Sequence, residues 1–263
     1  MTVPGRCRFD GDGKLRGPAN VTYNTPFPTR NGSFGSGAMN GALMHTMVTD
    51  LPEAVTIFNT DRGANSASAH FGISQAGEIH QFGPVGKGWI AWHAMAANAT
   101  YYGIEHADSG KPDTPLTDAQ IAASAQVVEA LSAFADFPLA VTDVPGGKGY
   151  GTHFMGGAAY GGHTCPDLPP QHVRSAQRAA ILALAGQIRQ EGKVVSLTTD
   201  GTKSLADIAA DHGGSAAYIL HLTAAAGPAW PPVVRDWLCG VFDGAASPTA
   251  PVPAGCVLRV PAT

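Results

Sequence analysis

The chain has 263 residues, of which 44% are hydrophobic and 14% are charged, and its formal net charge is -4. This composition is sufficient for one domain with an ordinary core and a smaller appended domain. No run of Lys or Arg occurs, and no segment approaches the roughly 20 apolar residues of a membrane span, so we expect neither nucleic acid nor a membrane as a partner. The N-terminus has no apolar stretch, which predicts synthesis without a secretory signal.

The first part of the chain predicts an arm followed by short strands. Residues 1–38 are rich in Gly, Pro, Asn and Thr, which is typical of an irregular arm without chemistry of its own. Residues 42–48 have the composition of a strand that is buried on both faces. The only ionisable group of this strand is His45, which needs a polar partner there. Residues 69–74 and 78–82 predict two further short strands joined by a turn.

Two helices are predicted in the second half of the chain. Thr117-Asp118-Ala119-Gln120 is a capping box, and apolar residues follow it at helical spacing as far as Ala135. A second amphipathic helix is predicted over residues 171–190. Strands before and between helices indicate an α/β or α+β domain. We place this domain at residues 39–192 and a smaller domain at residues 193–263.

Three side chains can be interpreted as ligands of one zinc ion. His45 lies on the predicted buried strand, and His153 and Cys165 flank a Gly-rich loop. Two neutral imidazoles and one thiolate leave the fourth tetrahedral position of zinc open to water, which is the catalytic pattern of ligation. Two other interpretations stay open, namely a hydrogen-bonded core histidine for His45 and an incidental histidine in a surface loop for His153.

Other polar residues have two interpretations each. His70 and His93 lie beside apolar residues and either line a groove or have a structural role. Glu105 ends an apolar run, where a carboxylate either pairs with a surface cation or lies near a metal as a base. Cys239 and Cys256 lie in the same C-terminal segment and either form a disulfide or stay reduced and buried.

Six short motifs follow one another in a characteristic order. They are Leu43-Met44-His45-Thr46, Ser68-Ala69-His70-Phe71 with the hairpin that ends at Phe82, Ala91-Trp92-His93-Ala94 with Asn98, Gly103-Ile104-Glu105, the capping box from Thr117 to Gln120, and His153 with Cys165-Pro166. This series resembles the zinc-dependent N-acetylmuramoyl-L-alanine amidases of the type-2 amidase and peptidoglycan-recognition superfamily, which is common among phage endolysins. The resemblance covers about residues 39–190, and only the series as a whole is specific.

The resemblance implies a fold and a metal site. It implies an α/β fold with a central mixed β-sheet flanked by helices, and a Zn²⁺ ion bound by His45, His153 and Cys165. The separation between His153 and Cys165 is longer than is usual in the family, which leaves His163 as a rival second ligand. The chain also has Asp167 where the family usually has Gly.

The resemblance further implies a mechanism of amide hydrolysis. Zinc would lower the pKa of its bound water towards about 7, and Glu105 would take a proton from that water and pass it to the departing amine. His163 would stabilise the oxyanion at a position where many family members have Lys. Some relatives use a Tyr where this chain has Ala69, so Glu105 would act without it. The predicted substrate-binding residues are His70, His93 and Asn98.

The C-terminal segment resembles a LysM module, a small βααβ unit that binds glycans containing N-acetylglucosamine. Residues 200–209 resemble the opening of such a module, and residues 253–261 resemble its end. The two helices would cover residues 208–222 and 233–242, although the segment between the first helix and the end is longer than usual. The alternative is a small structural domain that packs on the enzyme.

Together these features predict a peptidoglycan hydrolase that cleaves the bond between N-acetylmuramic acid and L-alanine. Its partners would be muropeptides and glycan strands of the bacterial wall. Without a secretory signal, such an enzyme is expected to be a phage endolysin that stays in the host cytoplasm and reaches the wall at lysis. The alternatives are a non-catalytic peptidoglycan-recognition module and a cysteine peptidase that uses Cys165 with His153 or His163.

Overall fold

The structure is a computed structural model, and it describes residues 3–24, 39–60, 66–86, 89–111, 113–167, 172–191, 194–198, 201–211, 252 and 257–261. The chain divides into two compact units, Met1–Arg189 and Gln190–Thr263. The predicted domain boundary, between residues 192 and 193, falls close to this division. None of the helices in the described ranges has the length and apolarity that a membrane span requires.

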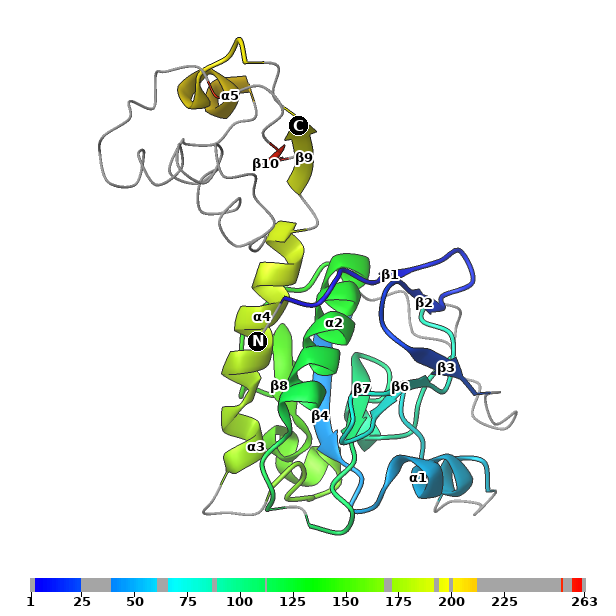
Figure 1. Ribbon diagram of the computed structural model, residues 1–263. Helices are drawn as coiled ribbons and strands as arrows, with labels where there is room; N and C mark the ends of the chain where they lie inside the picture. The colour runs from blue at the N-terminus through cyan, green and yellow to red at the C-terminus, as the bar shows by residue number, and fades with distance from the viewer. Residues whose placement is uncertain are drawn as a thin grey trace. The chain divides into compact units, whose positions relative to one another are not determined.

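A six-stranded mixed sheet lies at the centre of the first unit (Figure 1). In sheet order its strands are β3 (Val21–Tyr23), β6 (Ile79–Gln81), β5 (Phe71–Ile73), β7 (Tyr101–His106), β4 (Gly41–Thr46) and β8 (Gly149–Thr152). β5 and β6 are antiparallel, and the other neighbouring strands are parallel. This arrangement confirms the predicted central mixed sheet.

The buried strand β4 brings the predicted site residues together. All six of its residues are buried, as the apolar composition of residues 42–48 predicts. β4 lies between β7 and β8, so it adjoins the strand that carries Glu105 and the strand that leads to His153. In the parallel register with β7, His45 pairs with Glu105. Paired residues on neighbouring strands project from the same face of a sheet, so these two side chains share a face.

Helix α2 (Asp118–Ala135) contacts β4 and β5 and begins at the predicted capping box. The Thr117 hydroxyl accepts a hydrogen bond from the Gln120 amide at 3.1 Å, and the Gln120 side chain accepts one from the Thr117 amide at 3.1 Å. The helix predicted over residues 171–190 is divided into α3 (Val173–Ala176) and α4 (Arg178–Glu191). Gln177 lies between them, and its side chain hydrogen-bonds both the amide and the carbonyl of Leu116.

A further helix, α1 (Leu51–Phe58), was not expected from the sequence pattern. It begins at Asp50, whose carboxylate accepts a hydrogen bond from the Glu53 amide at 3.0 Å. Its apolar face packs in a small cluster with residues of the 69–91 region. The main core lies elsewhere and joins the sheet to the long helices; it includes Met44, Tyr102, Ile104, Val128, Leu131, Ile181 and Ile188.

Residues 3–24 contain three short strands that the sequence pattern did not indicate. β1 (Arg8–Phe9) pairs with β2 (Leu15–Arg16), and β3 forms the edge of the main sheet beside β6. Arg6 also forms an ion pair with the fully buried carboxylate of Glu129 on α2, at 3.0 Å. Strands of two or three residues are too short to produce a detectable alternation, so composition alone suggested a loop. Residues 25–38 lie outside the described residues.

The second unit contains three described elements. β9 (Val194–Thr198) pairs antiparallel with β10 (Val257–Pro261), and α5 (Leu205–Asp211) lies between them in sequence. The Ser204 hydroxyl accepts a hydrogen bond from the Asp207 amide at 3.1 Å and so caps α5. α5 begins three residues before the first predicted helix. The second predicted helix and the Cys239–Cys256 pair lie outside the described residues.

Candidate active site

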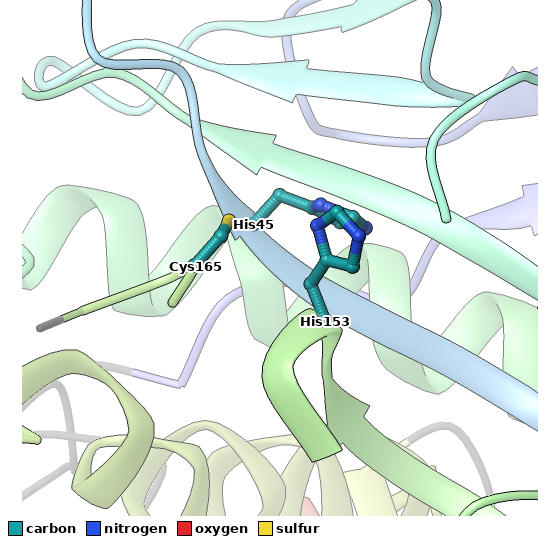
Figure 2. Close-up of side chains that lie close together, drawn as sticks. All are labelled: His45, His153 and Cys165. Carbon is teal, nitrogen blue, oxygen red and sulfur yellow. The ribbon is translucent and has the colours of Figure 1, made fainter. Parts of the chain in front are cut away.

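Three side chains converge beside the end of β4 (Figure 2). His45 belongs to β4, His153 begins the 3-10 helix η4 (His153–Tyr160) directly after β8, and Cys165 follows the loop after η4. One ligand atom from each residue lies within 4.8 Å of those of the other two. The structure therefore brings together the three residues predicted as metal ligands. His163, the rival second ligand, is not part of this group.

The hydrogen bond of His153 determines which of its nitrogens faces the group. Nε2 of His153 lies 2.6 Å from the carbonyl oxygen of Tyr160. A carbonyl only accepts, so Nε2 carries the proton and Nδ1 of the neutral ring keeps its lone pair. Burial lowers the pKa of His153 below its usual value and so favours this neutral form. A contact of this kind typically orients a metal-binding histidine.

Cys165 presents its sulfur to the same space. Sγ accepts a hydrogen bond from the backbone amide of Thr46 at 3.1 Å. Burial, followed by the negative charge of Glu105, raises the pKa of the Cys165 thiol well above its usual range. A thiolate is therefore unfavourable at this position unless a cation binds nearby. This environment is also unsuitable for a cysteine nucleophile, which requires a lowered pKa.

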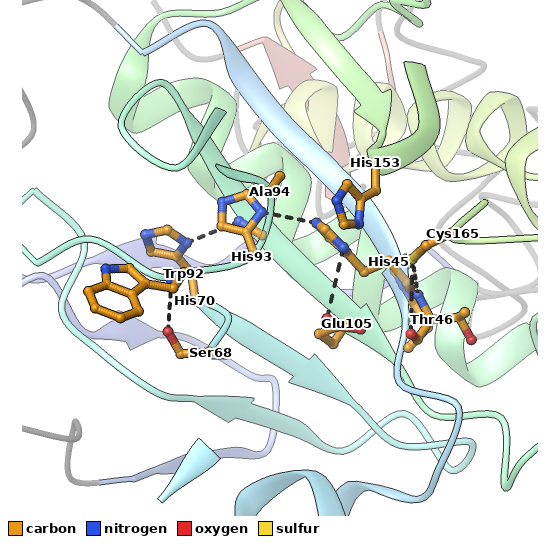
Figure 3. Close-up of polar contacts among 12 residues, drawn as sticks. His45, Thr46, Ser68, His70, Trp92, His93, Ala94, Glu105, His153 and Cys165 are labelled. Atoms are coloured by element: carbon orange, nitrogen blue, oxygen red, sulfur yellow. Dashed lines mark hydrogen bonds and ion pairs between the residues drawn. The ribbon is translucent and has the colours of Figure 1, made fainter. Parts of the chain in front are cut away.

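Glu105 adds a carboxylate to the lone pairs of the three predicted ligands. His45, His153, Cys165 and Glu105 are together called the acceptor group. Its Oε1 lies 3.9 Å from Nδ1 of His45, and its Oε2 is buried without a hydrogen-bond partner among the described residues (Figure 3). Burial, with a smaller effect from the charge of Asp108, raises the pKa of Glu105 to about 8. Imidazole, thiolate and carboxylate lone pairs that face one another favour a cation between them. Two imidazoles and a thiolate are a donor set that zinc accepts, so the residues fit a zinc ion.

A pocket of about 580 Å³ opens next to these residues. His153 forms part of its wall, and exposed Trp92 and Met95 contribute apolar surface. Three residues with predicted functions other than metal binding also line it, namely His93, Asn98 and His163. The ring of His163 packs against that of His153, with 4.8 Å between centroids. His153 is therefore the residue through which the pocket adjoins the acceptor group.

Asn98 and His70 have structural contacts. The side-chain oxygen of Asn98 accepts hydrogen bonds from the backbone amides of His93 and Ala94, at 2.9 and 2.7 Å. His70 is 0% exposed and does not line the pocket, and its Nδ1 accepts a hydrogen bond from the Gly103 amide at 3.0 Å. Contact between His70 and a substrate stays a prediction, and this burial does not support it.

Sequence reasoning missed a buried polar network behind Cys165. Arg174 is 1% exposed and donates to the hydroxyl of Thr46 at 2.9 Å, and that hydroxyl donates to the carboxylate of Asp108. Asp167 accepts a hydrogen bond from the Arg174 amide at 2.9 Å. The network therefore orients Thr46, whose amide contacts Cys165. The only sequence signal was Asp167, which replaces the usual glycine and here caps the start of α3.

The family model described as N-acetylmuramoyl-L-alanine amidase matches residues 35–168. This match covers just over half of the chain and includes every predicted site residue. The chain therefore belongs to the N-acetylmuramoyl-L-alanine amidase family, whose members act on peptidoglycan. Among the curated proteins, none matches the chain.

Several solved structures also resemble the chain. The Staphylococcus aureus hydrolase AmiA in complex with its ligand has 12% identity and a TM-score of 0.48, over 64% of this chain and 84% of that chain. An AmpD derivative has 19% identity and a TM-score of 0.45, over 66% and 98%. A mutant endolysin from Bacillus subtilis has 18% identity and a TM-score of 0.43, over 64% and 99%. At these values the likenesses do not define the activity of this chain.

Proposed function

We propose that the protein hydrolyses the amide bond between N-acetylmuramic acid and L-alanine in peptidoglycan, with a zinc ion bound by His45, His153 and Cys165. The observation that carries this proposal is the convergence of these three ligand atoms within 4.8 Å of one another. The carboxylate of Glu105 lies beside them, and a pocket opens next to them. Membership of the amidase family supports the choice of bond.

The ligand set supports zinc as the metal. Three protein ligands of the imidazole and thiolate type leave one tetrahedral position for water or substrate, which is the arrangement of catalytic zinc sites. When bound, zinc would supply Lewis acidity that polarises the amide carbonyl and activates water. The residues around it would then position groups and transfer protons.

Glu105 is suited to proton transfer. The oxygen Oε2 has no other hydrogen bond among the described residues, so it is available to an attacking water. In this proposal Glu105 takes a proton from that water and passes it to the nitrogen of L-alanine as the C–N bond breaks. His163, at the pocket wall, donates a hydrogen bond to the carbonyl oxygen as negative charge develops there.

Wall digestion tests the bond that is cleaved. Purified peptidoglycan is incubated with the enzyme, and new reducing ends, new amines and the identity of each new N-terminal residue are measured. We expect new N-terminal alanine without new reducing ends, and a release of alanine that is about 10²- to 10⁴-fold slower with Glu105→Gln. New reducing ends would instead indicate a glycosidase, and a new N-terminal residue other than this alanine would indicate a peptidase.

We further propose that the protein is a phage endolysin, which stays in the host cytoplasm until the membrane opens and then reaches the wall. The support is the LysM-like sequence of the second unit, which would bind glycan strands of intact wall. Expression in a host cell tests this: we expect lysis only after the membrane is permeabilised. N-acetylglucosamine oligomers should also compete with the binding of the full chain to purified wall. Lysis without permeabilisation, or binding that the oligomers leave unchanged, would contradict the proposal.

A further inference from the structure

His93 lies beside His45, a predicted metal ligand (Figure 3), and its ring also contacts a backbone carbonyl. Its Nε2 is 3.0 Å from the carbonyl oxygen of Tyr101, and its Nδ1 is 3.0 Å from Nε2 of His45. The carbonyl only accepts, so Nε2 of His93 is the donor in the first contact. Nδ1 of a neutral His93 then has only a lone pair, so Nε2 of His45 must be the donor in the second contact.

This order of donors determines where His45 has its free lone pair. With the proton on Nε2, Nδ1 of His45 is unprotonated, and Nδ1 is the atom that lies 3.9 Å from Glu105. The carbonyl of Tyr160 produces the same tautomer in His153. Both histidines therefore present Nδ1 to the acceptor group. The two arrangements differ because His45 is oriented by a side chain, whereas His153 is oriented by the backbone directly.

The ring of His93 is held in this position by its surroundings. His93 is 9% exposed, and such burial disfavours a charged ring. The side-chain oxygen of Asn98 accepts a hydrogen bond from the backbone amide of His93. The ring also packs closely on Gly103 of β7, where an added Cβ would lie 2.7 Å from Cγ of His93. A side chain at Gly103 would therefore displace the ring.

We propose that His93 is a positioning residue for the metal site and that it acts through His45. It fixes the proton of His45 on Nε2, orients the ring and leaves Nδ1 ready to bind a cation. This inference rests on the proposed function, and it assigns His93 a role other than the substrate contact predicted from the sequence. It also gives a physical reason for the glycine of the Gly103-Ile104-Glu105 motif, because that glycine leaves room for the His93 ring.

The first test needs no metal. Long-range ¹H–¹⁵N NMR spectra of the metal-free full-length protein report which ring nitrogen of each histidine carries the proton. We expect the Nε2–H tautomer for both His45 and His93. A proton on Nδ1 of His45, or a mixture of its two tautomers, would overturn the proposal. The result does not depend on whether the protein binds zinc or hydrolyses peptidoglycan.

The second test measures zinc affinity by competition with a chromophoric chelator. We expect His93→Leu to weaken zinc binding about 10- to 100-fold, as is typical for the loss of a residue that orients a ligand. His93→Gln keeps one donor and one acceptor and should recover part of this loss. Gly103→Ala should also weaken binding, because it displaces the His93 ring although it replaces neither His93 nor His45. The matched control is His80→Gln, at a half-buried histidine that does not line the pocket.

The outcomes distinguish this inference from the proposed function. Unchanged zinc affinity in folded His93→Leu, with an increased KM for peptidoglycan fragments, would make His93 a substrate contact and overturn the inference. Absence of zinc binding in the wild-type protein would overturn the proposed function. The tautomer measurement would still decide whether His93 fixes the proton of His45 on Nε2. Circular dichroism establishes that each variant is folded. If His93→Leu does not fold, Gly103→Ala and the NMR spectra decide.

Discussion

Oε1 of Glu105 lies 3.9 Å from Nδ1 of His45, and the two residues are paired in the register of the parallel strands β7 and β4. The distance between the proposed base and the first proposed ligand is thus set by backbone pairing within the sheet. Sites built on strands hold their groups more precisely than sites on loops. His153 begins η4 directly after β8 and Cys165 follows η4, so the part of the site that is built on strands is the β4–β7 pair.

The role of Glu105 as a base predicts a selective loss of rate. Glu105→Gln keeps the size of the side chain but cannot take a proton, and we expect kcat to fall about 10²- to 10⁴-fold. Zinc content, measured by mass spectrometry, should not change, because Glu105 is not among the three proposed ligands. The matched control is Glu78→Gln at an exposed turn, which should have no effect. A fall in zinc content that parallels the loss of rate would contradict this role.

If Cys165 binds zinc as a thiolate, replacing it should cause loss of the metal. Cys165→Ser replaces a soft charged ligand with a neutral hydroxyl, so we expect the variant to lose most of its zinc and most of its activity. Zinc content and wall hydrolysis are measured on the same preparation. Cys7→Ala is the control, because Cys7 is a buried free cysteine within the main core. Full zinc and full activity in Cys165→Ser would show that Cys165 is not a ligand.

His163 is predicted to stabilise negative charge without binding the metal. We expect His163→Ala to lower kcat about 10²- to 10³-fold, as is typical when an oxyanion donor is lost. His163→Lys should retain activity, because lysine is common at this position in the family that the sequence resembles. Zinc affinity should stay at the wild-type value in both variants. A large decrease in zinc affinity would instead make His163 the second ligand in place of His153.

The raised pKa of Tyr102 predicts that the free energy of unfolding decreases at alkaline pH. Its ring is 1% exposed, and burial raises its pKa to about 12, above the value of about 10 for an unfolded chain. The stability that this neutral tyrosine contributes is fully present below pH 10 and is lost as pH rises towards 12. The loss approaches about 1.4 kcal/mol per pH unit, because the unfolded state has released a proton that the folded state retains.

Tyr102→Phe tests this relationship because phenylalanine keeps the buried ring and cannot ionise. Urea denaturation at a series of pH values gives the free energy of unfolding of both proteins. Between pH 10 and 12 we expect the variant to lose less stability than the wild-type protein, and the difference measured at pH 8 serves as the reference. Curves that remain parallel up to pH 12 would show that Tyr102 ionises as it does in the unfolded chain.

Local sequence signals predicted the central elements well. The apolar run around His45 predicted β4, and the capping box at Thr117 predicted the start of α2. The central mixed sheet was inferred from family resemblance and is confirmed. The family resemblance favoured His153 over His163 as the second ligand, and this assignment stays a prediction. The conformation of the chain at η4 places the His153 ring beside His45, with 4.6 Å between the ring centroids, and no local sequence pattern indicates this conformation.

What the sequence could not predict depends on contacts between distant segments. β3 joins the sheet by pairing with β6, although its three residues have no distinctive pattern. The contact between His45 and His93 requires the pairing of β4 with β7 together with the turn that Asn98 stabilises. Arg174 reaches Thr46 from a helix late in the chain. No local pattern encodes such contacts, because each depends on the assembled fold.

The most direct test of the central claim is stepwise removal and return of zinc. The purified protein is stripped with a chelator, dialysed and titrated with Zn²⁺ while bound metal and the release of N-terminal alanine from purified wall are measured together. We predict no release from the stripped protein and a linear recovery that is complete at one zinc per chain. Full release of alanine by protein that contains no metal would contradict the account.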